Sequence, residues 1–139
     1  RAWEVLEATG RGLSRWQAET PPPAVPLARA RAMVLEMDRQ TLFARCDARF
    51  DAMLAEGALE EAEAVAGLGL APGAPGLTPV GAAELVAHVR GEMPLAEAAA
   101  RAKAATRAYA KRQQTWFANQ MAGWPRLPAG SGPEAALAL

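Results

Sequence analysis

The chain has 139 residues, and its 15 basic and 15 acidic side chains give a formal net charge of zero, while 51% of its residues are hydrophobic. This composition excludes disordered, collagen-like and strongly basic proteins, and the length fits one small domain with a single core. Cys46 is the single cysteine, which excludes an intramolecular disulfide framework and a zinc site built from several cysteines. We therefore expect a reducing compartment, with the cytoplasm as the location.

The ends and the uncharged stretches of the sequence give no sign of a membrane protein. The longest uncharged stretch, residues 64–83, is interrupted by glycines and prolines and is not expected to span a membrane. The first residue is Arg1 rather than methionine, and no signal-peptide pattern follows it. We expect a fragment of a monomeric protein that has no membrane partner.

The zero net charge conceals a division along the chain. Residues 51–97 carry eight acidic side chains against the single basic residue Arg90, whereas residues 98–133 carry six basic side chains and no acidic one. Clustered Lys and Arg side chains favour a polyanionic partner, because they displace counterions condensed on phosphates. Alternatively, the basic helix pairs with the acidic middle segment, and charge counts leave both possibilities open.

The first part of the chain predicts two helices and a connector. Residues 2–9 form a helical pattern that ends at Gly10, and Ser14 with Gln17 matches a capping box that opens a second short helix. Four prolines within residues 20–26 predict an extended connector.

A short strand and a longer helix are predicted next. Residues 32–37 are apolar and brief, which indicates a buried strand, and Asp38 is suited to cap the helix that begins at Arg39 and ends near Gly57. The apolar side chains of this helix recur every three or four residues: Leu42, Phe43, Cys46, Phe50, Met53 and Leu54. This stripe predicts that Cys46 is a buried, inert thiol.

Helices dominate the remaining sequence. Residues 59–66 predict an acidic helix and residues 84–90 a further one, separated by a Gly- and Pro-rich loop. Pro94 is suited to the first position of a long alanine-rich helix that continues to about Met121. Residues 124–127 predict a last short strand.

The long basic helix contains the sequence Thr-Arg-Ala-Tyr-Ala-Lys-Arg-Gln-Gln-Thr-Trp-Phe at residues 106–117. It closely resembles the C-terminal signature of bacterial tRNA dimethylallyltransferases, also called isopentenyl-diphosphate:tRNA transferases. Three further segments resemble segments of this family in order and spacing: Arg-Ala-Trp-Glu-Val with Thr-Gly and Leu-Ser in residues 1–14, the Arg-rich helix in residues 38–61, and Val-Gly to Gly-Glu in residues 80–92. The resemblance spans roughly residues 1–128.

The resemblance implies an α/β fold, of which this chain is the C-terminal, mostly helical part. The whole fold is of the P-loop NTPase type, and about two short strands of this chain complete a parallel sheet. We expect helices and a Pro-rich connector in residues 1–27, the C-terminal part of the catalytic and tRNA-binding core in residues 28–127, and a disordered tail in residues 128–139. The chain contains no G-x-x-x-x-G-K-[ST] loop, so it lacks the family's phosphate-binding half and is expected to be inactive alone.

The activity implied by the resemblance is tRNA modification by a prenyltransferase. The N6 amine of adenosine at tRNA position 37 displaces diphosphate from dimethylallyl diphosphate. This weak nucleophile needs a flipped base, a proton acceptor and cations around the diphosphate. The implied partners are tRNA and dimethylallyl diphosphate, with Mg²⁺ as a cofactor whose ligands lie outside this chain. The alternative is a non-catalytic helical module that binds RNA or protein through the basic helix, residues 101–117.

Site residues follow from the resemblance, position by position. Arg49 would bind the diphosphate, since a guanidinium fork matches phosphate oxygens, although an arginine on a helix is commonly an ordinary surface residue. The tRNA-binding residues would be Arg1, Thr78, Pro79, Val80, Gly81, Lys111, Arg112, Gln113, Gln114, Thr115, Trp116, Phe117 and Ala118. Ala82, Ala83 and Ala118 stand where the family commonly has larger residues, so two of its polar contacts are not expected.

Trp116 and His88 have a simpler interpretation than a role in binding or catalysis. Trp116 can stack on a base, but a tryptophan on an amphipathic helix is more often packed in the core, and packing is the prediction that we favour. His88 is the single histidine and follows no nucleophile pattern, so no chemistry is assigned to it. No catalytic or metal-binding residue is expected in this chain.

Overall fold

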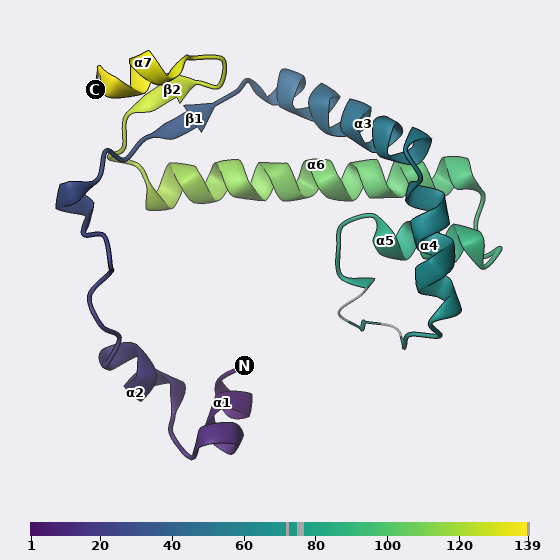
Figure 1. Cartoon of the computed structure of the whole chain (residues 1–139), viewed down its shortest axis with the longest axis horizontal. Coiled ribbons are helices and arrows are strands. Elements are labelled where there is room, and N and C mark those ends of the chain that lie inside the picture. Colours follow the sequence, from purple (N-terminus) through teal and green to yellow (C-terminus); the bar gives the residue numbers. More distant parts are fainter. Residues whose placement is uncertain (72, 75–76, 139) are drawn as a thin grey trace.

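The computed structural model describes residues 1–71, 73–74 and 77–138, and most of them are helical (Figure 1). The elements in chain order are α1 Ala2–Thr9, α2 Leu13–Ala18, the 3₁₀ helix η1 Leu27–Arg29, β1 Val34–Glu36, α3 Arg39–Ala55, α4 Ala58–Gly67, α5 Ala82–Val89, α6 Leu95–Gln120, β2 Arg126–Pro128 and α7 Pro133–Leu137. The prediction of a mostly helical chain with two short strands is confirmed. None of the helices in this described part combines the length and the apolar character needed to cross a bilayer.

The hydrophobic core lies where α3 and α5 pack against the N-terminal half of α6, and where α4 packs against α5 and α3. Its buried members are Phe50, Ala62, Leu85, Val86 and Ala102. Ala102 is fully buried, and its small side chain lets the neighbouring helices approach α6 closely. The core therefore fixes one end of α6, while the other end extends toward the sheet (Figure 1).

Gly81 begins α5 at the centre of this core. Its φ of 96° lies in the left-handed region, and a Cβ atom at this position would lie 3.1 Å from Phe50 Cε2 and 3.3 Å from Ala102 Cβ. Both the backbone conformation and the close packing therefore favour glycine.

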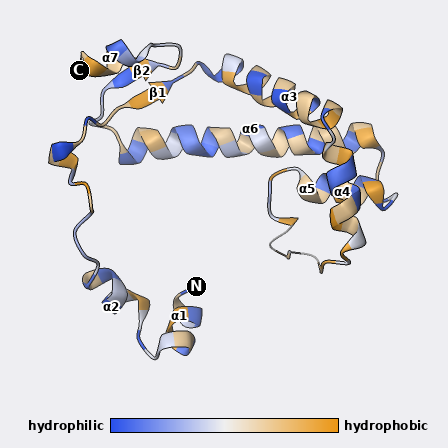
Figure 2. Ribbon diagram, viewed as in Figure 1, coloured by the Kyte–Doolittle hydropathy of each residue, from blue (hydrophilic) through white to orange (hydrophobic). Residues whose placement is uncertain are grey.

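The two strands pair with each other in parallel, with Val34 opposite Arg126. The parallel direction confirms the prediction, and α3 to α6 form the long connection that parallel strands require. The prediction of a buried first strand is right only for Val34, because Leu35 points to the other face of the sheet and is 60% exposed. In Figure 2, β1 is drawn mainly in the orange of hydrophobic residues.

The N-terminal helices α1 and α2 form an arm that an extended segment joins to the rest of the chain (Figure 1). Gly10 ends α1 in the left-handed conformation, as predicted. The predicted capping box is wrong: Gly12 is the N-cap of α2, and Ser14 lies inside the helix without a capping hydrogen bond. The Thr9 hydroxyl accepts from Arg11 N instead, so the turn after Gly10 is held from α1.

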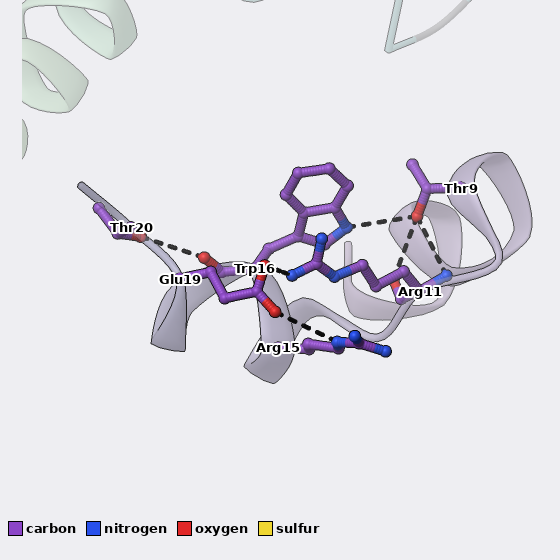
Figure 3. Close-up of polar contacts among 6 residues, drawn as sticks. All are labelled: Thr9, Arg11, Arg15, Trp16, Glu19 and Thr20. Carbon is purple, nitrogen blue, oxygen red and sulfur yellow. Dashed lines mark hydrogen bonds and ion pairs between the residues drawn. The ribbon is translucent and has the colours of Figure 1, made fainter.

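Polar and aromatic contacts join the two helices of the arm (Figure 3). The Arg11 guanidinium lies 4.4 Å from the centroid of the Trp16 ring and forms an ion pair with Glu19. The Trp16 indole nitrogen donates to the Thr9 hydroxyl over 3.4 Å. The arm is thus a local hairpin held mainly by its own side chains.

The start of α6 and the C-terminal tail differ from the sequence-based prediction. Pro94 is the N-cap of α6 rather than its first helical residue, because its ψ of 150° is extended. The tail, which was expected to be disordered, contains α7, where Pro133 occupies the first turn and alanines favour helix. The Leu137 carbonyl accepts a hydrogen bond from Arg31, which connects this short helix to the segment before β1.

Candidate nucleic-acid interface

Carboxylates neutralise the basic residues in the N-terminal half of α6. Lys103 forms an ion pair with Asp51 at 2.5 Å, and Arg107 forms one with Asp47 at 2.6 Å. Arg101 pairs with Glu97 one turn earlier in the same helix. The pairing interpretation of the basic helix is therefore correct for this half: Asp51 and Glu97 belong to the acidic segment 51–97, while Asp47 lies just before it.

The C-terminal half of α6 has a different electrostatic environment. Lys111 and Arg112 are exposed, and no carboxylate of the described residues forms an ion pair with either. The Arg112 guanidinium lies 5.6 Å from the centroid of the Tyr109 ring, which is 48% exposed. Two positive charges thus remain available to a polyanion beside an exposed aromatic ring.

Trp116 lies beside Lys111 and Arg112 on α6. Its side chain is 52% exposed and contacts only the edge of Phe117 among the aromatic rings described, with centroids 5.5 Å apart. The prediction that Trp116 packs in the core is wrong, because α6 turns Ala110, Gln114 and Phe117 toward the sheet and Trp116 about 120° away from Ala110. Its exposure suits the alternative, stacking on a base.

We call the outer surface of this half of α6 the α6 outer face. It contains a shallow cleft of about 470 Å³, lined by Ala108, Lys111, Arg112, Thr115, Trp116, Asn119 and Gln120. Tyr109 adjoins this cleft through its contact with Arg112. Tyr109 is not among the site residues predicted from the sequence, although its spacing of three and seven residues from Arg112 and Trp116 places all three on one side of a helix.

A second and larger cleft, of about 770 Å³, lies between α6 and the two strands. The remaining signature residues line it: Gln113, Gln114, Phe117 and Ala118. Gln114 is held there by a hydrogen bond from its Nε2 to the Met37 carbonyl over 3.3 Å. Consecutive helical residues point in all directions, so one surface cannot contact all eight signature residues at once. The predicted tRNA-binding stretch therefore divides between two sides of α6.

Asp38 lies at the carboxyl end of β1, beside the larger cleft. Its carboxylate accepts a hydrogen bond from Thr41 N at 2.9 Å, which confirms the predicted N-cap. Hydrogen bonds from Thr41 lower the pKa of Asp38, and the bond from its side chain has a larger effect than the bond from its backbone. The charged form of the carboxyl group is thus favoured at the start of α3.

The structure does not bring Arg49 together with the signature residues of α6. Asp47 and Asp51 face α6, and Arg49 is two positions from each of them, so it points to the other side of α3. Arg49 is exposed, lines neither of the two clefts, and has no carboxylate partner within the described part of the chain. Within this chain, the predicted diphosphate-binding and tRNA-binding residues form separate surfaces.

The other predicted tRNA-binding residues are also separate from the α6 outer face. Gly81 is buried against Ala102 of α6. Ala102 precedes Lys111 by nine residues, or roughly 14 Å along the helix axis. Thr78, Pro79 and Val80 are exposed. Arg1 lies at the start of the arm, in an exposed ion pair with Glu4. Of the predicted tRNA-binding residues, the structure brings together only those of α6.

Neither His88 nor Cys46 forms part of these surfaces. His88 Nδ1 lies 3.0 Å from the Met93 carbonyl oxygen, which ties α5 to the loop before α6. Cys46 is only partly buried, so the prediction of a buried thiol is wrong in degree. The described residues include no group of three or more His, Cys, Asp or Glu side chains that could hold a metal ion.

Comparison with known proteins connects these surfaces to a family. A family model described as IPP transferase matches residues 1–120. The chain belongs to the IPP transferase family. This confirms the resemblance on which the sequence-based assignment rests.

Relatives of this IPP transferase chain carry a more specific name. A tRNA dimethylallyltransferase of Cereibacter sphaeroides (strain ATCC 17029 / ATH 2.4.9) is 58% identical over 130 residues, which cover 92% of this chain and 41% of the relative. One of Dinoroseobacter shibae is 52% identical over 131 residues, which cover 94% and 44%. The chain therefore spans about two fifths of the length of these curated relatives.

Solved structures agree with the fold of the IPP transferase chain. A tRNA delta(2)-isopentenylpyrophosphate transferase of Staphylococcus epidermidis matches with a TM-score of 0.67 and 29% identity, over 92% of this chain and 41% of that one. A tRNA isopentenylpyrophosphate transferase of Bacillus halodurans matches with a TM-score of 0.66 over 75% of this chain and 34% of that one.

Proposed function

We propose that this IPP transferase chain is the tRNA-contacting part of an enzyme that transfers a dimethylallyl group from dimethylallyl diphosphate to the N6 amine of adenosine 37 in tRNA. The observation that carries the proposal is the α6 outer face: its cations, which pair with no described carboxylate, and its exposed tryptophan belong to the segment that resembles the family's signature. The proposal is further supported by the 58% identity of this chain to a protein named tRNA dimethylallyltransferase. The alternative of a non-catalytic module is less favoured, because it does not account for a match that covers 92% of the chain.

The α6 outer face supplies two kinds of contact to RNA. Lys111 and Arg112 would neutralise backbone phosphates, since neither charge is used by a described carboxylate. Tyr109 and Trp116 expose aromatic faces on which unstacked bases can lie. A flipped adenosine leaves its neighbours unstacked, so such aromatic surfaces suit this reaction.

Arg49 would act on the other substrate. In the reaction a bond forms between the adenosine N6 and the allylic carbon, the carbon–oxygen bond breaks, diphosphate leaves, and the amine proton passes to an acceptor. Negative charge develops on the leaving diphosphate, and an unpaired guanidinium stabilises it. Because Arg49 faces away from α6, we propose that another part of the enzyme completes the diphosphate site beside α3.

We also propose that β1 and β2 belong to a larger parallel sheet of the P-loop NTPase type. A two-stranded sheet is marginally stable at best, and parallel sheets are normally covered on both faces. Leu35 is 60% exposed on a face of β1, which supports a further layer there. The remaining strands would lie in the part of the relatives that this chain does not match, and the chain alone would be inactive.

Mg²⁺ and the cellular location are further parts of the proposal. We propose Mg²⁺ as a cofactor that would neutralise the diphosphate, with its ligands outside this chain, as the family resemblance implies. We propose a monomeric enzyme that acts in the cytoplasm, where tRNA is its partner.

A chimaera tests the proposed function. This chain replaces the matching segment of the Cereibacter sphaeroides relative, and the purified chimaera is incubated with labelled dimethylallyl diphosphate and tRNA. Label in N6-modified adenosine after nuclease digestion is the expected result, and tRNA with guanosine at position 37 is the control. A folded chimaera that binds tRNA without transferring label would favour the non-catalytic module.

A further inference from the structure

One side chain outside the signature connects the end of α6 to both strands. Arg126 Nη2 donates to the Phe117 carbonyl over 3.2 Å and to the Met121 carbonyl over 3.1 Å. Its Nη1 forms an ion pair with Glu36 of β1 at 3.3 Å, and its backbone pairs with Val34. The Arg126 side chain is 28% exposed. Its guanidinium is therefore already engaged in three interactions.

These interactions add a cation to a helix end whose carbonyls already accept backbone amides, since Met121 N donates to the Phe117 carbonyl and Trp124 N to the Met121 carbonyl. The last carbonyl groups of a helix have no partners within the helix, and their partial negative charge favours a nearby cation. The last turn of α6 contains no basic residue of its own. Arg126 supplies this cation from β2, and it binds carbonyl groups on either side of the helix end at Gln120.

The same turn of α6 carries part of both clefts. Trp116, Asn119 and Gln120 line the cleft on the α6 outer face, while Phe117 lines the cleft against the sheet. The direction of this turn therefore sets where the indole ring of Trp116 points. No other described cation donates to these carbonyl groups.

We propose that Arg126 is a positioning residue for tRNA binding. It holds the last turn of α6 against β1 and β2, so that Trp116 and the cleft around it keep one orientation, and it does not contact the RNA itself. This inference rests on the proposed function, because it assumes that the α6 outer face binds tRNA. It adds a residue from outside the family signature to the machinery of recognition.

The test uses the same chimaera with three variants. Arg126→Met removes the cation and keeps a side chain of similar reach, Arg126→Lys keeps the charge without the planar fork, and Glu36→Gln removes only the ion pair to β1. For each variant, kcat and KM are measured with tRNA and with dimethylallyl diphosphate. Amide hydrogen exchange is followed at Met121 and Trp124, whose amides donate to the carbonyls of Phe117 and Met121.

A positioning role has a specific pattern of effects. Arg126→Met is expected to raise KM for tRNA about tenfold and to speed exchange at both amides, because it removes two charge-assisted hydrogen bonds. The kcat and the KM for dimethylallyl diphosphate stay within about twofold. Arg126→Lys is expected to show a smaller rise, and Glu36→Gln a smaller one still. If Arg126→Met does not fold, the rise in KM and the faster exchange in Arg126→Lys carry the test.

Salt dependence separates positioning from direct contact. A residue that binds phosphate reduces the slope of log affinity against log salt by about 0.9 when it is removed. We expect the slope to be unchanged in Arg126→Met. A reduced slope, or an unchanged KM for tRNA in a chimaera that transfers label, would overturn the inference. Absence of transfer by the unsubstituted chimaera would instead count against the proposed function.

Discussion

Arg107 of α6 donates from one guanidinium nitrogen to both carboxylate oxygens of Asp47 in α3, over 2.6 and 2.8 Å. Both side chains are about one third exposed, so the pair is partly shielded from water. The contact lies between the hydrophobic core and the α6 outer face. It fixes α3 to α6, and it withdraws a cation of the family signature from the surface available to RNA.

We predict that this ion pair contributes to stability and not to tRNA binding. In the chimaera, Arg107→Met should lower the free energy of unfolding by about 1 kcal/mol, since charge-assisted hydrogen bonds that are partly exposed contribute modestly. The salt dependence of tRNA affinity should not change. Thermal unfolding of the two single variants and of the double variant with Asp47→Ala measures the coupling, and fully additive effects would contradict the prediction.

Lys111 and Arg112, which pair with no described carboxylate, should instead contribute to tRNA binding. Replacing Lys111 and Arg112 by alanine should weaken tRNA binding and lower the salt slope by roughly 1.8, because two phosphate contacts are lost. Arg101→Ala is the matched control, because Arg101 already pairs with Glu97 on the same helix. Filter binding at several salt concentrations checks both, and equal slopes in the two variants would argue against phosphate contacts at the α6 outer face.

Trp116→Ala should weaken tRNA binding about tenfold or more with little change in unfolding temperature. Stacking of one base on an aromatic ring contributes roughly 1–3 kcal/mol, whereas a side chain that is 52% exposed adds little to packing. Trp116→Phe should retain most of the affinity, since it keeps a ring. A large fall in unfolding temperature with unchanged affinity would show that Trp116 is structural after all.

Arg49→Ala should lower kcat for transfer while tRNA affinity stays nearly constant. Arg49 is exposed and unpaired among the described residues, and its proposed partner is the leaving diphosphate. Arg45→Ala is a suitable comparison, because Arg45 lies one turn earlier on the same side of α3. Equal turnover in the two variants would remove Arg49 from the diphosphate site.

Acid should weaken the start of α3. Because hydrogen bonds from Thr41 lower the pKa of Asp38 in the folded chain, the unfolded chain binds this proton more readily. The stabilisation by Asp38 is therefore fully present above its ordinary pKa of about 3.9 and decreases as pH falls further. Asp38→Asn keeps a good N-cap without titrating. When the pH is lowered below about 4, the difference in the free energy of unfolding between the chimaera and this variant should decrease. A constant difference would refute the assignment.

Local features of the sequence predict local structure well. The strand, Asp38 and the following helix are recognisable because a capping residue and an apolar stripe act within a few positions. Ser14 fails as a cap because glycines on its N-terminal side allow a turn that starts α2 earlier. The order of elements between β1 and β2 was therefore predictable, with boundaries shifted by one or two residues.

The candidate site was less predictable, because it depends on how α6 is rotated against the sheet. Trp116 and Phe117 are adjacent aromatic residues, yet one is exposed and the other half-buried. Only tertiary packing decides which of them faces the strands. Arg126 was missed for the same reason, since its carbonyl partners become visible only when β2 returns beside the end of α6.

The fully buried Ala102 lies 14 residues before Trp116 on one uninterrupted helix, a separation of roughly 21 Å. A tilt of α6 by about 5° at this alanine would displace the tryptophan by about 2 Å, a shift large enough to misalign a stacked base. A bulkier residue at Ala102 would therefore move Trp116, and with it the proposed RNA contact, from a distance of several helical turns.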